Sequence, residues 1–320
     1  MDIAELLEPF TKMIQTVSTS SEVRRIERGG QIDQMWSEIE ASGFLDALVG
    51  EDRGGPGLRL ADLALLIETV GANAVPLPVA ETIVVRGLLA QAKVDAPRGP
   101  IVIASSLAHP VPCALTSEYA LVDSGQEVLL ASTASLQPAG TGISHNLSAW
   151  LLSPKQAISL PRSEGGLRPL AASIRAALIA GAAERLTEMS ANYAKERVQF
   201  GKPIGKQQAI QQMLAVMAED MIACRIAART ALSKGLDVSV SVAATAKITT
   251  SIAAARIAAS AHAVHGAIGI SEEHDLQLLV RRLHEWRLAD GSESYWASIL
   301  GKSRLSSNTT TLDWVRSEIA

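Results

Sequence analysis

The chain has 320 residues, of which 48% are hydrophobic and only 3% aromatic, and its formal net charge is −4. This length allows two or three subdomains with substantial cores, the aromatic-poor composition favours packed helices over a large β-sandwich, and the weakly acidic balance gives no support to nucleic-acid binding. The two cysteines lack metal-ligand spacing, so we expect no metal, and they fit a reducing compartment. We find neither a signal peptide nor an apolar run long enough to span a membrane, and therefore expect a cytoplasmic protein that does not bind membranes.

The first part of the chain, residues 1–96, is predicted to be a helical domain. Apolar residues recur at helical spacing over 32–44 and 60–70, and a third helix is expected at 79–93. The glycine-rich run at 51–57 does not follow a strand. We therefore interpret it as a tight turn and not as a Rossmann phosphate loop.

A small β-domain is predicted for residues 97–165. Four short runs have the apolar composition of strands and are separated by Pro, Gly, Ser and Asp: 101–104, 119–122, 128–131 and 149–152.

The remainder, 166–320, is predicted to be a helical bundle. Its expected helices are 170–197, 206–234, 238–264, 272–288 and 292–306. Long antiparallel helices joined by short links imply a four-helix bundle. The predicted fold class is thus mainly α with a small β middle domain.

The strongest functional signal is the segment 197–210, which begins Arg-Val-Gln-Phe-Gly and ends inside a new helix. A cation and an exposed glycine turn before a helix can receive a phosphate-bearing cofactor, because free backbone N–H groups and the helix dipole favour anions. The segment resembles the RxxFGxxIxxxQA segment of the acyl-CoA dehydrogenases. The order of helical domain, small β-domain and helical bundle is also similar to the order in that family.

A second stretch, 262–270, reads His-Ala-Val-His-Gly-Ala-Ile-Gly-Ile and resembles the family's Q-x-x-G-G-x-G turn, which lies against the adenosine-diphosphate half of FAD. Gly266 and Gly269 keep two of the family's glycines, whereas Ala263 and Ala267 replace its glutamine and second glycine. A helix C-cap at Gly266 is the alternative interpretation. The nearby histidines offer no complete zinc ligand set.

The resemblance also makes Asp290 the candidate catalytic base. Counted without gaps from Gly266, the family's Y-E-G-T run falls on residues 289–292, Ala-Asp-Gly-Ser. In most relatives that glutamate removes the α-proton of an acyl-CoA thioester. Aspartate is one methylene shorter, and about 1 Å of misplacement can cost on the order of a hundredfold in rate. A helix N-cap before Glu293 is the alternative role for these residues.

The middle domain lacks the Glu-Pro-x-Ala-Gly-Ser loop and the Trp-Ile-Thr strand that hold the flavin ring in the family. The resemblance therefore implies a chain that keeps one half of a flavin site, like the smaller subunit of the heteromeric bacterial acyl-CoA dehydrogenases of steroid degradation, a branch of lipid metabolism. It implies FAD as cofactor, an acyl-CoA as substrate, a full-length acyl-CoA dehydrogenase as partner in a heterotetramer, and electron transfer flavoprotein as oxidant.

The residues that the resemblance assigns to FAD binding are Arg197, Gln199, Phe200, Gln208, Gly266, Gly269 and Ser292. Two other functions stay open at this point. One is a self-sufficient, homo-oligomeric acyl-CoA dehydrogenase with Asp290 as its base. The other is a non-catalytic structural subunit that binds no flavin.

Overall fold

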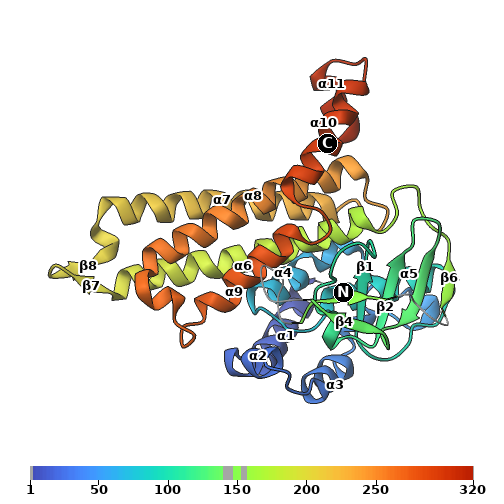
Figure 1. Cartoon of the computed structure of the whole chain (residues 1–320), viewed down its shortest axis with the longest axis horizontal. Helices are drawn as coiled ribbons and strands as arrows, with labels where there is room; N and C mark the ends of the chain where they lie inside the picture. The colour runs from blue at the N-terminus through green and yellow to red at the C-terminus, as the bar shows by residue number, and fades with distance from the viewer. Residues whose placement is uncertain (1–2, 140–146, 153–156, 320) are drawn as a thin grey trace.

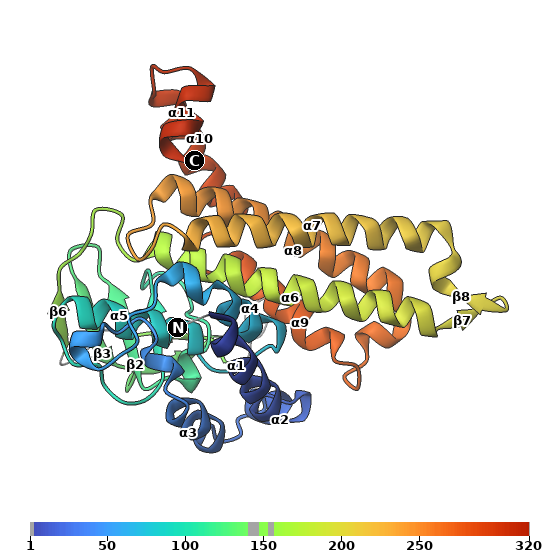
Figure 2. The same ribbon diagram turned by 180° about the vertical axis from the view of Figure 1, so that it is seen from behind.

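The computed structural model describes residues 3–139, 147–152 and 157–319. Its amino-terminal part consists of helices, as expected (Figures 1 and 2). The helices are α1 (Ile3–Val17), α2 (Ser20–Glu27), α3 (Asp33–Ala41), α4 (Ala64–Ala72) and α5 (Val79–Gln91). The run at 51–57 forms a single 3-10 turn followed by Gly54 at φ 83°, so the prediction of a turn is confirmed.

The middle of the chain folds into small sheets. The strands are β1 (Ile101–Ala104), β2 (Tyr119–Asp123), β3 (Val128–Ser132), β4 (Leu136–Pro138), β5 (Ala149–Leu151) and β6 (Ile158–Leu160). Among the described residues, one sheet has the order β1-β2-β3-β6, with β1 parallel to β2 and the other neighbours antiparallel, and β4 pairs with β5 separately.

All four expected strands are confirmed, but β4 and β6 were missed. Both are three residues long and mostly exposed. A short strand with little buried surface carries no clear alternation of apolar and polar residues, and this alternation is the signal that a sequence offers.

The carboxyl-terminal part is dominated by α6 (Arg168–Glu196), α7 (Gln208–Leu232) and α8 (Val240–His265), which pack on one another. The shorter α9 (Leu276–Leu288) lies against α6 and α8, so the predicted four-helix bundle is confirmed. Figures 1 and 2 show the bundle extending from the β region to a small hairpin of β7 (Val198–Gln199) and β8 (Lys202–Pro203) at its far end.

Two further helices complete the chain. α10 (Glu293–Ser306) packs on α8 and leads into α11 (Thr311–Glu318), and both project from the body. α11 was not predicted. Across the described ranges, no helix has both the length and the apolar character that crossing a membrane requires.

The amino-terminal domain is fixed to the bundle by backbone contact between α4 and α6. A β-carbon added to Gly181 would lie 1.8 Å from the Glu68 carbonyl oxygen, and one added to Gly71 would lie 2.1 Å from the Leu178 carbonyl oxygen. Only glycine permits this approach, so each helix supplies one glycine to the crossing.

We expect Gly181→Ala to lower the free energy of unfolding by about 1–3 kcal/mol, because the helices must separate to admit the methyl group. Urea denaturation measures the change. Gly301→Ala is the matched control: this glycine is exposed in α10 with nothing within 4 Å of the added carbon. Its substitution should stabilise by about 0.5–1 kcal/mol through helix propensity. An unchanged stability for Gly181→Ala would contradict the close crossing.

Candidate functional site

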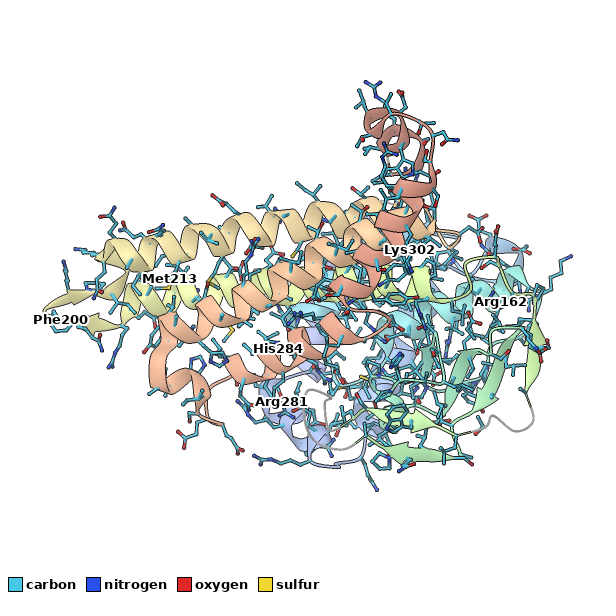
Figure 3. The ribbon with its side chains drawn as sticks, turned by 45° about the horizontal axis from the view of Figure 1, so that its top comes forward. Arg162, Phe200, Met213, Arg281, His284 and Lys302 are labelled. Atoms are coloured by element: carbon cyan, nitrogen blue, oxygen red, sulfur yellow. The ribbon has the colours of Figure 1, made fainter. Side chains whose placement is uncertain are left out.

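The candidate residues fall into two groups at opposite ends of the bundle. Arg197, Gln199, Phe200 and Gln208 lie with the glycine turn at the free end, which we call the bundle tip (residues 193–210 and 262–276). Asp290 and Ser292 lie between α9 and α10, beside the β region. In Figure 3, Phe200 marks the tip, whereas Arg162 and Lys302 lie toward the other end.

The hairpin at the tip is built by backbone hydrogen bonds. The Arg197 N–H donates to the Tyr193 carbonyl at 2.9 Å and ends α6, and the Ile204 N–H donates back to the Arg197 carbonyl at 2.8 Å. β7 (Val198–Gln199) pairs with β8 (Lys202–Pro203) across a two-residue turn. Both turn residues have positive φ, 52° at Phe200 and 76° at Gly201, as a tight two-residue hairpin turn requires.

The side chains of this hairpin face outward. Phe200 is 92% exposed, which is exceptional for an aromatic ring. Arg197 and Gln199 are exposed, and in the part of the chain that the structure describes Arg197 has neither an ion-pair nor a hydrogen-bond partner for its guanidinium. Gln208 is the exposed first residue of α7, so its neighbourhood includes the unpaired N–H groups of a helix start. The tip therefore presents a free cation, an aromatic face and a positive helix end together.

The glycine turn is the 3-10 segment Gly266–Ile270 after α8. Gly266 has φ 62° and ψ −141°, a conformation that favours glycine, and a β-carbon there would meet nothing within 4 Å. Gly269 is buried, and a β-carbon on it would lie 3.1 Å from the His265 β-carbon. Gly266 thus leaves the backbone open to a ligand, and Gly269 allows the turn to pack on α8.

Hairpin and turn adjoin each other through a small apolar cluster of Ala194, Ile204 and Val264. The ring of Tyr193 stacks on that of His265, with 4.5 Å between centroids. The fold therefore unites six of the seven expected cofactor residues at one end of the molecule. The seventh, Ser292, is elsewhere: its hydroxyl accepts a hydrogen bond from the Tyr295 N–H and caps α10.

Ser292 and Asp290 line a groove between the loop after β1 and the start of α10. One pocket of this groove has a volume of about 320 Å³ and is also lined by Ser105, His109 and Arg168. A neighbouring pocket of about 210 Å³ shares His109 with it and reaches the buried carboxylate of Glu285. The guanidinium of Arg168 lies 5.0 Å from the centre of the Tyr295 ring at the groove.

The carboxylate of Asp290 is engaged on both oxygens. The Ser105 hydroxyl donates to Oδ1 at 2.7 Å, and Nε of the buried Arg175 donates to Oδ2 at 3.0 Å. Arg175 also pairs with Glu81. Burial opposes the charge of Arg175, but the two carboxylates outweigh it and raise its pKa. If Asp290 took up a proton, Arg175 would keep only one charged partner in the interior.

Two ionisable residues near Asp290 carried no signal in the sequence. Glu285 accepts a hydrogen bond from the Ser148 hydroxyl and pairs with the buried Arg282. Lys247 is buried in α8, and its ammonium donates to the Arg287 carbonyl at 2.7 Å. In the sequence, Lys247 is only a polar interruption of an apolar helix. Its position within electrostatic range of Asp290 depends on packing between distant segments.

Burial lowers the pKa of Lys247 to about 7. Between pH 7 and its ordinary value of 10.5, the unfolded chain holds a proton that the folded chain lacks, so stability rises with pH over this window. We expect the free energy of unfolding of the native protein to rise, relative to Lys247→Met, by up to about 1.4 kcal/mol per pH unit in that window. Lys302→Met, at an exposed lysine of α10, should leave the slope unchanged. Parallel native and Lys247→Met curves would show that this ammonium is not desolvated.

Comparisons with known proteins agree with the fold and the family resemblance. Residues 171–305 match the family described as acyl-CoA dehydrogenase, C-terminal domain. The acyl-CoA dehydrogenase IpdE2 of Mycobacterium tuberculosis is 31% identical over 266 residues, which are 80% of this chain and 81% of that protein. The crystal structure of the ChsE4–ChsE5 complex from Mycobacterium tuberculosis is similar with a TM-score of 0.83 at 20% identity, covering 97% of this chain and 100% of the other. A structure of the steroid ACAD (acyl-CoA dehydrogenase) Tcur3481–Tcur3483 is similar with a TM-score of 0.79 at 20% identity. The match covers 95% of this chain and 99% of the other.

Proposed function

The chain belongs to the acyl-CoA dehydrogenase family, and from this we propose that it is one subunit of a heteromeric enzyme that oxidises an acyl-CoA thioester between its α and β carbons with FAD. Its part would be to supply the adenosine-diphosphate half of a flavin site whose other half belongs to a full-length partner subunit.

The separation of the bundle tip from the groove is the observation that carries this proposal. α6 runs from one to the other over 29 residues, which is about 43 Å at 1.5 Å per residue. The cation, ring and helix start of the tip therefore cannot serve a ligand in the groove of the same chain. They would instead serve a ligand that is held by a second subunit.

The residues of the tip fit the cofactor. Arg197 would pair with the diphosphate, since a guanidinium without a protein partner offers bidentate, charge-assisted hydrogen bonds. Gln199, Phe200 and Gln208 would flank the adenosine, and Gly266 would let it approach the backbone. Gly269 would let this turn pack closely on α8. Ser292 lines the groove and could contact only a ligand that is bound there. When bound, FAD accepts the β-hydrogen of the thioester as a hydride.

The names of similar proteins support the partner and the substrate class. The ChsE4–ChsE5 and Tcur3481–Tcur3483 structures each combine two differently named chains, and the latter is a steroid ACAD. We extend this to a heterotetramer that acts on a steroid-derived acyl-CoA, with electron transfer flavoprotein as the oxidant.

The test is flavin content, by absorbance, of this chain purified alone and co-purified with a full-length acyl-CoA dehydrogenase from the same genome. We expect no flavin in the isolated chain and stoichiometric flavin in the complex. In the Arg197→Ala complex we expect a Kd for FAD about ten- to a hundredfold higher, because this is the change in affinity that follows from the loss of one hydrogen bond to a charged group. Arg185→Ala, an exposed cation on the same helix, is the control. Full flavin in the isolated chain would overturn the shared site and favour the homo-oligomeric enzyme. Flavin unaffected by Arg197→Ala would favour a structural subunit.

Asp290 is expected to hold Arg175 in place in this complex, and the partner is expected to supply the base. Asp290→Asn should therefore change the rate of flavin reduction by substrate only a few-fold, while lowering the melting temperature of the complex because Arg175 loses a charged partner. Stopped-flow absorbance measures the first and calorimetry the second. A loss of about a thousandfold in the rate with flavin retained would instead identify Asp290 as the base.

A further inference from the structure

Three aromatic rings from three segments form a stack beneath the bundle tip. Tyr193 of α6 lies face to face with His265 of α8, at 4.5 Å and 23°. His274, just before α9, meets His265 edge-on at 5.0 Å. Tyr193 accepts the backbone hydrogen bond of Arg197, and His265 precedes Gly266. The stack therefore joins the hairpin to the glycine turn.

The hydrogen bonds fix the protonation of His265. Its Nδ1 lies 2.8 Å from the Ala261 carbonyl oxygen, which can only accept, so Nδ1 carries the proton of the neutral ring. Its Nε2 is buried and, among the described residues, has no hydrogen-bond partner. A second proton there would create a buried N–H with no acceptor, on a residue that is only 4% exposed.

The ring of His274 is held by a hydrogen bond in which its Nδ1 is the acceptor. Its Nδ1 accepts the Leu276 N–H at 3.1 Å, at the beginning of α9. Protonation of Nδ1 would place two N–H groups against each other and break this contact. The carboxylate of the adjacent Asp275 is held by Arg24 and Ser20.

The other titratable groups around His265 do not neutralise a charge on it. His262, on the same face of α8, has a buried Nδ1 without a partner in the described structure, and the group that faces His265 from α6 is the phenol ring of Tyr193. His284 of α9 interacts with His262 from the other side. A proton on one ring therefore repels a proton on the next.

We propose that Tyr193 and His265 are positioning residues that align the Arg197 hairpin with the Gly266 turn, and that this alignment holds only while His265 is neutral. The bundle tip is then sensitive to acid. The inference rests on the proposed function insofar as the aligned tip binds the diphosphate half of FAD.

The direction of the pH effect follows from burial. Burial, reinforced by His274 and His262, lowers the pKa of His265 against the opposing effect of its bond to Ala261. The folded tip then binds fewer protons than the opened tip, so its stability is complete above the ordinary histidine pKa of about 6.5 and falls as the pH drops below it.

The experiment uses the complex with the full-length partner and compares pH 7.5 with pH 5.5. Hydrogen exchange of residues 266–276, corrected for its intrinsic pH dependence, reports the turn directly, and Kd for FAD reports its consequence. We expect lost protection at pH 5.5 and a Kd about tenfold higher, since each proton taken up contributes up to tenfold per pH unit.

His265→Phe separates titration from stacking, because phenylalanine keeps a ring against Tyr193 and cannot be protonated. It should retain flavin at pH 7.5 and lose most of the acid effect, whereas His265→Ala should weaken FAD at both pH values. His109→Phe, at an exposed histidine of the groove, should respond to acid like the native complex.

Unchanged exchange in the native complex, or an equal acid effect in His265→Phe, would overturn the inference. Failure of the proposed function gives a different result. In that case exchange would still depend on pH and on His265, while flavin content would not respond to Arg197→Ala at either pH.

Discussion

The ion pairs of the buried Arg175 guanidinium are the interaction on which the arrangement of this chain depends. Arg175 lies in α6 and is paired with Glu81 from α5 and with Asp290 from the link between α9 and α10. These carboxylates are 94 and 115 residues away in sequence. A buried charge is tolerated only when it is paired and hydrogen-bonded, so the amino-terminal domain, the bundle and the start of α10 must all be in place together. The close crossing of α4 and α6 at Gly71 and Gly181 holds the amino-terminal domain against the bundle.

This constraint has a consequence for chemistry. A carboxylate that abstracts a proton must be able to change its charge, whereas one that compensates a buried arginine must keep it. Asp290, which the resemblance places at the family's catalytic glutamate, makes the contacts of a compensating carboxylate: Ser105 and Arg175 hold both of its oxygens. The charged contacts in the groove of this chain thus stabilise the fold, and the exposed side chains of Arg197 and Phe200 are at the opposite end of the bundle.

The bundle tip, in contrast to the groove, carries exposed side chains without partners in the described chain. Phe200 and Arg197 have no partners in the described chain and depend on rigid support from below. That support comes from apolar packing of Ala194, Ile204 and Val264 and from the stack of Tyr193 on His265. A surface on a hairpin is precise only if the hairpin is fixed, and here the fixing elements include the buried imidazole of His265, whose pKa burial lowers.

The sequence by itself determined the class of fold, the approximate limits of the long helices and four of the strands, because hydrophobic periodicity and helix termini are local signals. It also determined the family, through the segment that begins at Arg197 and the turn at Gly266. It did not reveal β4, β6 or α11, which bury too little surface to produce a pattern. Only the tertiary structure decided that Ser292 lies apart from the other candidate residues, that Asp290 pairs with Arg175, that Glu285 lines the groove and that Lys247 is buried within electrostatic range of Asp290. Each of these facts depends on contacts between segments far apart in the chain. The spacing of residues along the sequence does not determine which distant charged residues form ion pairs.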